Sequence, residues 1–283
     1  MNETKCIICG SKNIEKFPAK FSEFISRRVF DGENKNISII RCLECGFSFY
    51  SYRFNQSENK KLYLNYRDEE YQMLREQFEP DYTKEKNYLL KSDEIEFGSR
   101  EANMLRILNT HLSSINEIKT VLDFGGDKGQ LIYKAFPAAK KYVYEISNPD
   151  VFEEITLIND LDKIKNMKFD LVICAQVLEH VSNPIDIIKL IKNYLMPDGY
   201  FYIEVPYYTP FNKSSERIDT KEYLMHEHIN FYTIKSLEML MKSCGEILYS
   251  GVEDIKTTLG NTKVISALIA HCDRDYSKIS ILK

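Results

Sequence analysis

The sequence of 283 residues is long enough for one large domain and a small one, each with a buried core. Hydrophobic residues make up 43% of the chain, charged residues make up 28%, and the formal net charge of −4 gives no support to a strongly basic nucleic-acid-binding protein. No apolar run reaches the roughly 18 residues that span a bilayer, and no secretory signal is visible at the N-terminus, so we expect a cytoplasmic protein.

Residues 1–60 form the first predicted domain, a small module whose main signal is a pair of CxxCG motifs. Two residues between paired cysteines let both sulfur atoms of a tight turn face one ion, and the following glycine tolerates the positive φ of that turn. Together the motifs supply four thiolates, which is the closed tetrahedral ligand set of a structural Zn²⁺ site. The predicted ligands are Cys6, Cys9, Cys42 and Cys45.

A redox-active pair is the alternative for a single CxxC motif, but two copies that are each followed by glycine favour zinc. The 32 residues between the pairs are an unusually long interval, which we expect to contain further structure such as a hairpin. A domain this small needs such a metal for stability. The remaining cysteines stand alone in apolar surroundings, and we interpret them as packed side chains rather than nucleophiles: Cys174, Cys244 and Cys272.

Residues 61–115 form a predicted helical connector that is rich in Tyr, Glu, Lys and Leu, with helical spacing over residues 101–112. We expect it to act as a lid over an acceptor. Two interpretations of its aromatic residues stay open: they close over the acceptor, or they are ordinary packing residues. The residues concerned are Tyr63, Tyr66, Tyr71, Phe78 and Tyr82.

Residues 116–283 show apolar runs that alternate with helix-like stretches, which predicts βαβ units and a parallel sheet in an α/β fold. The strand-like runs are TVLDFG, KYVYEIS, FDLVICAQ and GYFYIEVP. Predicted helices are QLIYKAF and PIDIIKLIKNYL, and LMPDG at 195–199 is a predicted helix-ending turn. The last two runs, EILYSGV and KVISALIAHC, predict an antiparallel hairpin at one edge.

A glycine-rich loop, VLDFGGDKG at 121–129, follows the first predicted strand of this domain and precedes a predicted helix. Glycines let the backbone turn sharply and approach a ligand, whose polar groups then face the amides of the helix N-terminus. Glu145 ends the next strand, 22 residues after Asp123, where an acid can bind both ribose hydroxyls of an adenosine. Asp160 and Leu161 follow the third strand and are placed to meet the adenine edge.

The order VLDFGGDKG, YEIS, FDLVICAQVLEHV and LMPDGYFYIEVP resembles the class I S-adenosylmethionine methyltransferases over residues 118–205. The resemblance implies a Rossmann-like, doubly wound sheet of seven strands whose last strand is antiparallel, with S-adenosylmethionine as cofactor. It implies that Glu145 holds the ribose and that Gln176 and His180 lie beside the sulfonium, although His180 has the alternative role of fixing its own loop. The loop residues that it assigns to the cofactor are Asp123, Gly125, Gly126, Asp127 and Gly129.

A narrower resemblance is to the zinc-containing sugar C-methyltransferases, which pair a CxxC…CxxC module with a methyltransferase domain and carry a polar residue where Asp127 stands. They share a segment similar to HEHINFY at 226–232. The resemblance implies that Glu227 and His228 belong to the active site, with His228 as the base and His226 assisting. The alternative is a polar loop without a catalytic role.

Two departures from that family bear on the acceptor. Met225 stands where the family usually has a tyrosine, although Tyr223 is close, and the family usually has a further C-terminal domain, whereas this sequence stops at Lys283. We therefore expect a reduced or different sugar-bearing surface. The segment YYTPF at 207–211 follows the fifth strand, where ligands bind in doubly wound sheets, and is a predicted acceptor wall.

The predicted function is methyl transfer to carbon or oxygen of a small polar acceptor, such as a nucleotide-linked sugar or another precursor of a bacterial surface glycan. An RNA methyltransferase that binds through its zinc module is the alternative, because residues 1–61 hold 11 Lys or Arg against 7 Asp or Glu. The absence of a dense basic run with interleaved aromatic residues argues against it. A third interpretation is a donor-binding protein without catalytic activity.

Overall fold

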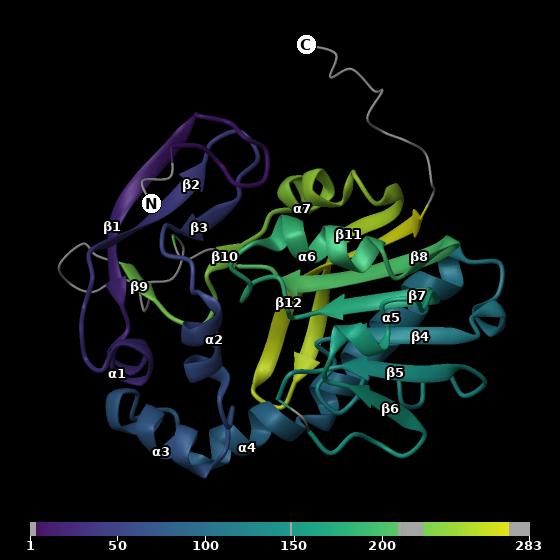
Figure 1. Cartoon of the computed structure of the whole chain (residues 1–283), viewed down its shortest axis with the longest axis horizontal. Coiled ribbons are helices and arrows are strands. Elements are labelled where there is room, and N and C mark those ends of the chain that lie inside the picture. The colour runs from purple at the N-terminus through teal and green to yellow at the C-terminus, as the bar shows by residue number, and fades with distance from the viewer. Residues whose placement is uncertain (1–3, 148, 209–210, 212–222, 272–283) are drawn as a thin grey trace.

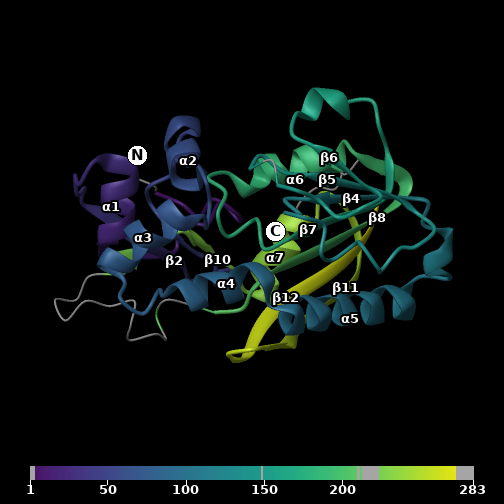
Figure 2. The same cartoon turned by 90° about the horizontal axis from the view of Figure 1, so that it is seen from below.

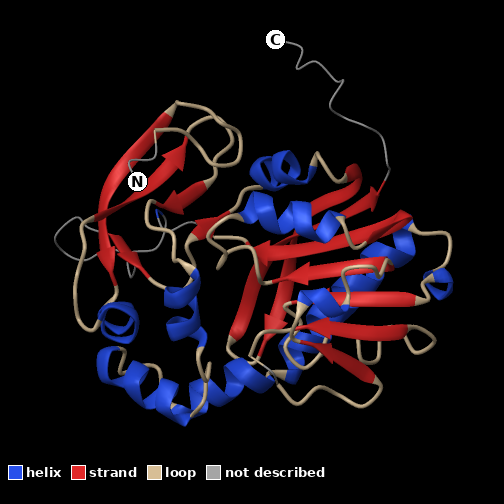
Figure 3. Ribbon diagram, in the orientation of Figure 1, coloured by secondary structure: helices blue, strands red, loops and turns tan. Residues whose placement is uncertain are grey.

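The computed structural model describes residues 4–147, 149–208, 211 and 223–271. Its main features are a seven-stranded sheet and a five-stranded sheet, with short helices running between them along one edge (Figures 1 and 3). None of the helices in these residues is long and apolar enough to cross a membrane.

The large sheet has the order β11-β12-β8-β7-β4-β5-β6. Its strands are β4 (Thr120–Phe124), β5 (Lys140–Tyr144), β6 (Ile155–Ile158), β7 (Phe169–Ala175), β8 (Leu195–Pro206), β11 (Gly245–Thr257) and β12 (Gly260–His271). β4, β5, β6, β7 and β8 pair in parallel, whereas β12 is antiparallel to both β8 and β11. This confirms the predicted sheet, including its antiparallel last strand and its edge hairpin.

Helices cover both faces of the large sheet, as Figure 2 shows, and this confirms the doubly wound class. α5 (Glu94–His111) packs on one face, and α6 (Pro184–Lys192) and α7 (Ile234–Met241) pack on the other. Alternate residues of β7 divide between the two cores: Leu171 packs on the α5 side and Val172 on the α6 side. Both faces of the parallel strands are therefore buried, which explains their continuous apolar sequence.

Two predicted local structures in this domain are wrong. Residues 130–135 form consecutive turns rather than the predicted α-helix, beginning with hydrogen bonds from the Ile132 and Tyr133 amides to the Gly129 carbonyl at 3.1 and 3.0 Å. Pro137 follows directly and disfavours helical backbone at residue 136, which limits how far a helix could continue.

The predicted turn at 195–199 belongs to β8 instead. The pairing of β7 with β8 shifts register there, from Phe169 opposite Leu195 to Leu171 opposite Tyr200. The extra residues on β8 form an irregularity at the end of the strand, which accommodates the Pro-Asp-Gly sequence without ending the sheet.

The small sheet has the order β10-β3-β2-β1-β9. Its strands are β1 (Ile14–Phe21), β2 (Ile37–Cys42), β3 (Ser48–Tyr50), β9 (Tyr223–Met225) and β10 (Asn230–Phe231), and the helix α1 (Glu23–Phe30) follows β1. The interval between the cysteine pairs is filled by the antiparallel strands β1 and β2, with α1 between them. β9 and β10 come from far along the chain and form the two edges of this sheet.

This pairing places residues 226–229 between the two edge strands of the small sheet. The division of the chain at residues 60 and 115 stays a prediction, and the strand pairing adds residues 223–225 and 230–231 to the sheet of the N-terminal module. The chain between the sheets contains α2 (Gln56–Tyr63), α3 (Glu69–Phe78) and α4 (Lys84–Ser92). Each of these helices begins at a capping side chain, Asn55, Asp68 or Thr83.

Candidate active site

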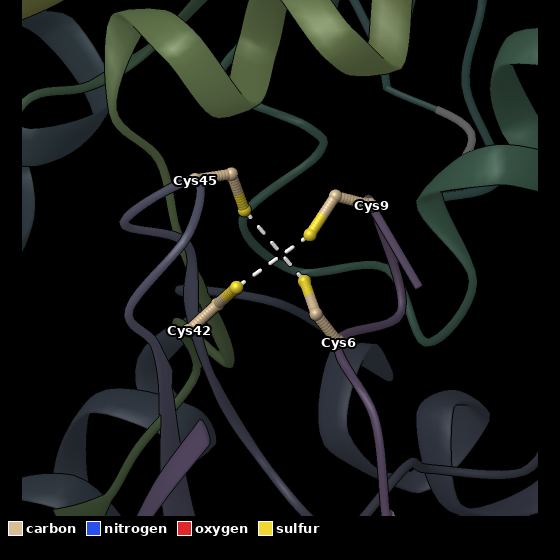
Figure 4. A group of neighbouring side chains, drawn as sticks. All are labelled: Cys6, Cys9, Cys42 and Cys45. Carbon is tan, nitrogen blue, oxygen red and sulfur yellow. Dashed lines mark hydrogen bonds between the residues drawn. The ribbon is translucent and has the colours of Figure 1, made fainter. Parts of the chain in front are cut away.

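Four cysteine side chains from the two CxxCG turns converge on one point (Figure 4). Sγ of Cys6 lies 3.7 Å from Sγ of Cys45, Sγ of Cys9 lies 3.5 Å from Sγ of Cys42, and all four atoms lie within 4.8 Å of one another. A tetrahedral site with metal–sulfur distances of about 2.3 Å has edges of about 3.8 Å. The cysteines are free thiols rather than disulfides, so the donor set fits a tetrahedral thiolate site.

The backbone of the two turns repeats the same geometry. The Gly10 amide donates to the Cys6 carbonyl and the Gly46 amide to the Cys42 carbonyl, both at 3.0 Å. The φ angles of the two glycines are 73° and 75°, which confirms the positive φ expected at this position. A hydrogen bond from the Cys45 thiol lowers the pKa of Cys6 to about 5, which favours the thiolate at that position.

The glycine loop leaves β4 in a sharply turned conformation that side chains would obstruct. Gly125 has φ of 78°, and a Cβ there would lie 2.5 Å from the Val177 side chain. Gly129 has φ of 86°, and a Cβ there would lie 2.4 Å from Ile155. Asp127, which stands where glycine is usual, also adopts a positive φ, of 48°. The loop therefore keeps its turn although one glycine is replaced.

Asp123, the residue before the last of β4, is a buried carboxylate beside this loop. Its side chain is 2% exposed, and its Oδ2 has no hydrogen-bond partner among the residues that the structure describes. Burial raises the pKa of Asp123 to about 7, although the nearby Arg100 acts to lower it. A Cβ at Gly126 would lie 2.5 Å from this Oδ2, so the glycine leaves the room that the carboxylate needs. These groups fit the polar end of a ligand that carries a positive charge.

Glu145 follows β5 directly, at the same edge of the sheet, and lines the cavity described below. Its Oε1 accepts a hydrogen bond from the Ser147 amide at 3.0 Å. Leu161 also lines the cavity, whereas Asp160 is not among the lining residues, and its carboxylate accepts from the Asp162 amide at 2.9 Å. The structure thus places Glu145 and Leu161 at the cavity, whereas Asp160 caps the start of a short 3-10 helix at Leu161–Lys163.

One cavity of about 930 Å³ joins the glycine loop to the segment at 226–229. Gln176 and His180 line it, and Gln176 has φ of 59° and donates from Nε2 to Oε1 of Glu204 at 3.2 Å. Predicted cofactor and acceptor residues therefore share a single space. Those that line it are Asp123, Gly125, Gly126, Asp127, Glu145, Leu161, Gln176, His180, Glu227 and His228.

His228 faces this cavity and is held by aromatic neighbours. Its Nδ1 lies 2.6 Å from the Tyr208 hydroxyl, and its ring meets the His180 ring edge-on with centroids 4.6 Å apart. Nδ1 of His180 lies 3.0 Å from the Tyr63 hydroxyl, and burial lowers the pKa of His180. Tyr208 belongs to the predicted acceptor wall, of which residues 209–210 lie outside the described residues.

Glu227 is 6% exposed and is held by a network of charged and polar groups. It accepts hydrogen bonds from the Tyr71 hydroxyl and, at 3.3 Å, from Nη1 of Arg75. Burial alone would raise the pKa of Glu227, but His226 and Arg75 outweigh it and hold the pKa at about 2. Nε2 of His226 in turn lies 2.6 Å from Oε1 of Glu79. These contacts anchor the segment to α3.

A second set of contacts joins the segment to the loop after β7. The amides of Ile229 and Asn230 both donate to the Glu179 carbonyl, at 2.8 and 3.1 Å. The Asn230 side chain donates to the carbonyls of Leu178 and Val181, both at 2.8 Å. Two segments that are about 50 residues apart are thereby fixed together, which sets His228 beside His180.

The aromatic residues of the connector separate into two groups. Tyr63 and Tyr66 line the cavity and also pack against the core of the small sheet, so both interpretations stay open for them. Tyr71 and Tyr82 are buried and, with Phe78, pack in the core of the small sheet. Tyr223, the suggested substitute for a family tyrosine, is buried against Phe17 and is not among the cavity residues.

Sequence reasoning missed two buried charged groups at the cavity. Arg100 of α5 contacts Glu204 of β8, with its Nε 2.6 Å from Oε1. Glu179 is 1% exposed, and burial raises its pKa to about 8. The signal for Glu179 was present in the sequence, because it is an acid that follows the apolar run at 171–175 within VLEH. Arg100 had no comparable signal, because charged residues on helices are usually exposed.

The strand order, the glycine turn after β4 and the acid after β5 together define the α/β fold of a class I methyltransferase. A family model described as "Methyltransferase domain" matches residues 66–245, which is more than half of the chain. The protein therefore belongs to this methyltransferase domain family.

A ubiquinone biosynthesis O-methyltransferase from Glaesserella parasuis serovar 5 (strain SH0165) is 30% identical over 100 residues, which are 34% of this chain and 39% of the relative's length. The solved N-methyltransferase NodS from Bradyrhizobium japonicum WM9 is 15% identical, with a TM-score of 0.44 over 64% of this chain and all of the other. The 1,6-didemethyltoxoflavin-N1-methyltransferase from Burkholderia thailandensis is 12% identical, with a TM-score of 0.49 over 84% and 96% of the two chains.

Proposed function

We propose that the enzyme transfers a methyl group from S-adenosylmethionine to a small polar acceptor, most suitably a nucleotide-linked sugar or another precursor of a bacterial surface glycan. The observation that carries this proposal is the shared cavity of about 930 Å³. It joins a side suited to an adenosine and an amino acid, around Glu145 and Asp123, to a side lined by tyrosines and histidines. That volume holds a donor together with an acceptor of sugar size.

On the donor side, Glu145 would hold the ribose hydroxyls, and Asp123 would face the amino group of the methionine portion. The buried, unpartnered Oδ2 of Asp123 supports this assignment, because a cationic ligand group would satisfy it. Leu161 would pack on the adenine. The sulfonium supplies an already activated methyl group, so the protein's task is to align the acceptor with it.

On the acceptor side, His228 would accept the proton that the acceptor loses as its bond to the methyl group forms and the carbon–sulfur bond breaks. Its hydrogen bond to Tyr208 fixes one ring nitrogen and orients the imidazole. Glu227 already contacts Tyr71 and Arg75, so we assign it a positioning role. His226 would support Glu227 through its own contact with Glu79.

The four cysteines would hold one structural Zn²⁺, for which their number and separations are suitable. The small sheet carries the segment with His228 between its edge strands, so the metal would stabilise the acceptor side of the cavity. Thiols that must stay reduced to bind zinc also favour the cytoplasm as the compartment.

The His228→Ala variant tests the catalytic assignment. We expect S-adenosylhomocysteine production with sugar nucleotides to fall by about 100- to 10,000-fold, because general base catalysis contributes about that much. Donor binding measured by calorimetry should change less than about threefold. His111→Ala, at an exposed position near the end of α5, is the matched control and should keep full activity.

Equal loss of turnover and donor binding in His228→Ala would contradict its role as the base. Turnover of RNA in the same assay, with none of the sugar nucleotides accepted, would contradict the acceptor class.

A further inference from the structure

Three potential metal ligands meet at the acceptor side of the cavity, apart from the cysteine cluster. Glu179 and His180 come from the loop after β7, and His228 comes from the segment between β9 and β10. One ligand atom from each lies within 4.8 Å of the others. All three residues line the same cavity. Two imidazoles and one carboxylate are a ligand set that binds divalent transition metals and leaves positions open for a substrate.

The carboxylate of this group has an unusual environment. Glu179 is 1% exposed, and neither of its oxygens has a hydrogen-bond partner among the residues that the structure describes. A buried carboxylate without a partner is costly, and such groups in native proteins usually have a proton, an ion or a ligand as partner. Oε1 of Glu179 lies 3.9 Å from Nε2 of His180.

Both histidines are oriented as metal ligands commonly are. Nδ1 of His180 lies 3.1 Å from the Glu227 carbonyl, so a proton on Nδ1 is donated to that oxygen and Nε2 carries the lone pair toward Glu179. Nδ1 of His228 is likewise hydrogen-bonded, to the Tyr208 hydroxyl. Ligating histidines generally use one ring nitrogen for the metal and the other for such an orienting bond.

We propose that Glu179, His180 and His228 bind one divalent cation, and that this cation coordinates a hydroxyl or enol oxygen of the acceptor. Ligand atoms around one ion at about 2.0–2.2 Å lie closer together than 4.8 Å, so side-chain rotation must draw them in. The backbone is already fixed for this, because the Ile229 amide donates to the Glu179 carbonyl at 2.8 Å and joins the two segments.

The inference rests on the proposed methyl transfer and replaces the general-base role of His228 with that of a metal ligand. With the cation bound, His228 holds the cation, and the cation lowers the pKa of the acceptor oxygen. The acceptor loses its proton to solvent water, the carbon–sulfur bond of the donor breaks, and a carbon–oxygen bond forms. The products are a methyl ether and S-adenosylhomocysteine, so the acceptor class narrows to compounds methylated on oxygen.

Electron paramagnetic resonance with Mn²⁺ tests the site without turnover. Mn²⁺ prefers oxygen and nitrogen ligands and competes poorly for four thiolates, so it reports this site in the zinc-loaded, full-length protein. We expect one Mn²⁺ per chain to lose its free-ion signal. Affinity should fall at least tenfold in Glu179→Gln, whereas Glu117→Gln, at an exposed position, should bind as the wild type does.

A wild-type protein that leaves Mn²⁺ free at millimolar concentration would overturn the proposal, as would a Glu179→Gln variant with unchanged affinity. If Glu179→Gln does not fold, as judged by circular dichroism, His180→Gln replaces it and must also lose at least tenfold. Failure to find an active acceptor would weaken the proposed function alone, since Mn²⁺ binding requires neither donor nor acceptor.

Discussion

The donor side and the acceptor side of the cavity are built in different ways. The donor side uses residues at the carboxyl ends of neighbouring parallel strands, such as Asp123 near the end of β4 and Glu145 directly after β5. The acceptor side joins distant parts of the chain: Tyr71 and Glu227 are hydrogen-bonded although 156 positions separate them. A parallel sheet places the carboxyl ends of its strands at one edge, so local sequence suffices for the donor side, whereas the acceptor side depends on contacts between two sheets.

The buried carboxylates on the two sides also differ, both in their hydrogen-bond partners and in their pKa. Glu227 is satisfied by Tyr71 and Arg75, and its pKa is about 2, so it is an internal anchor that stays ionised. Asp123 is equally buried but has an unpartnered oxygen and a pKa of about 7. A satisfied carboxylate fixes a loop, whereas an unsatisfied one is poised for a ligand.

Among the tests of this comparison, the largest effect is expected from disrupting the proposed zinc site on the acceptor side. Cys42→Ser should abolish zinc binding and disorder the small sheet, because structural zinc sites contribute many kcal/mol to folding. We expect methyl transfer to fall more than 100-fold, while the dissociation constant for S-adenosylhomocysteine stays within about threefold. Metal content, calorimetry and a turnover assay measure the three quantities.

Cys244→Ser is the matched control, since it also changes a buried thiol but lies outside the cluster. It should retain zinc and turnover. Loss of donor binding in Cys42→Ser to the same extent as turnover would show that the two sides do not act separately.

A smaller effect concerns pH on the donor side. Because Asp123 has a raised pKa of about 7, the ligand-free protein holds a proton there that the unfolded chain gives up near pH 4, so stability falls as pH rises from about 4 to 7. A cationic ligand group favours the ionised form, so donor binding at pH 7 should release up to about half a proton. Donor affinity should fall up to about tenfold per pH unit below 7.

Calorimetry in buffers of different ionisation enthalpy measures this proton release. The Asp123→Asn variant should release no proton and show a flat pH dependence between pH 5 and 7. Release of the same amount from this variant would assign the titration to another group.

The large sheet was predictable because its elements carry strong local patterns. The apolar runs of β4, β5, β7 and β8 and the final hairpin each lie where the sequence indicated. The glycine turn was predictable too, since Gly125 and Gly129 adopt conformations that side chains would obstruct. The absent helix at 130–136 shows the limit of that approach, because a short apolar stretch between two strands does not by itself fix a helix.

The acceptor side was predictable only as a list of residues. Resemblance marked Glu227 and His228, but nothing local indicated that their segment lies between two edge strands of the N-terminal sheet. Nor could spacing show that Tyr71 packs inside while Tyr63 faces the cavity. Partners such as Arg75 and Tyr208 follow from tertiary structure, since ion pairs between distant segments leave no periodic pattern in the sequence.

The central claim is that a carboxylate at the end of β5 holds the ribose of the donor, and calorimetry with S-adenosylhomocysteine tests it most directly. The zinc-loaded wild type should bind one molecule per chain, and Glu145→Ala should bind about 10- to 100-fold more weakly, since hydrogen bonds to a charged group contribute about 1.5–3 kcal/mol. Glu153→Ala, an exposed acid on the following loop, should bind as the wild type does. A wild type that takes up no ligand, or a Glu145→Ala variant with unchanged affinity, would contradict the account.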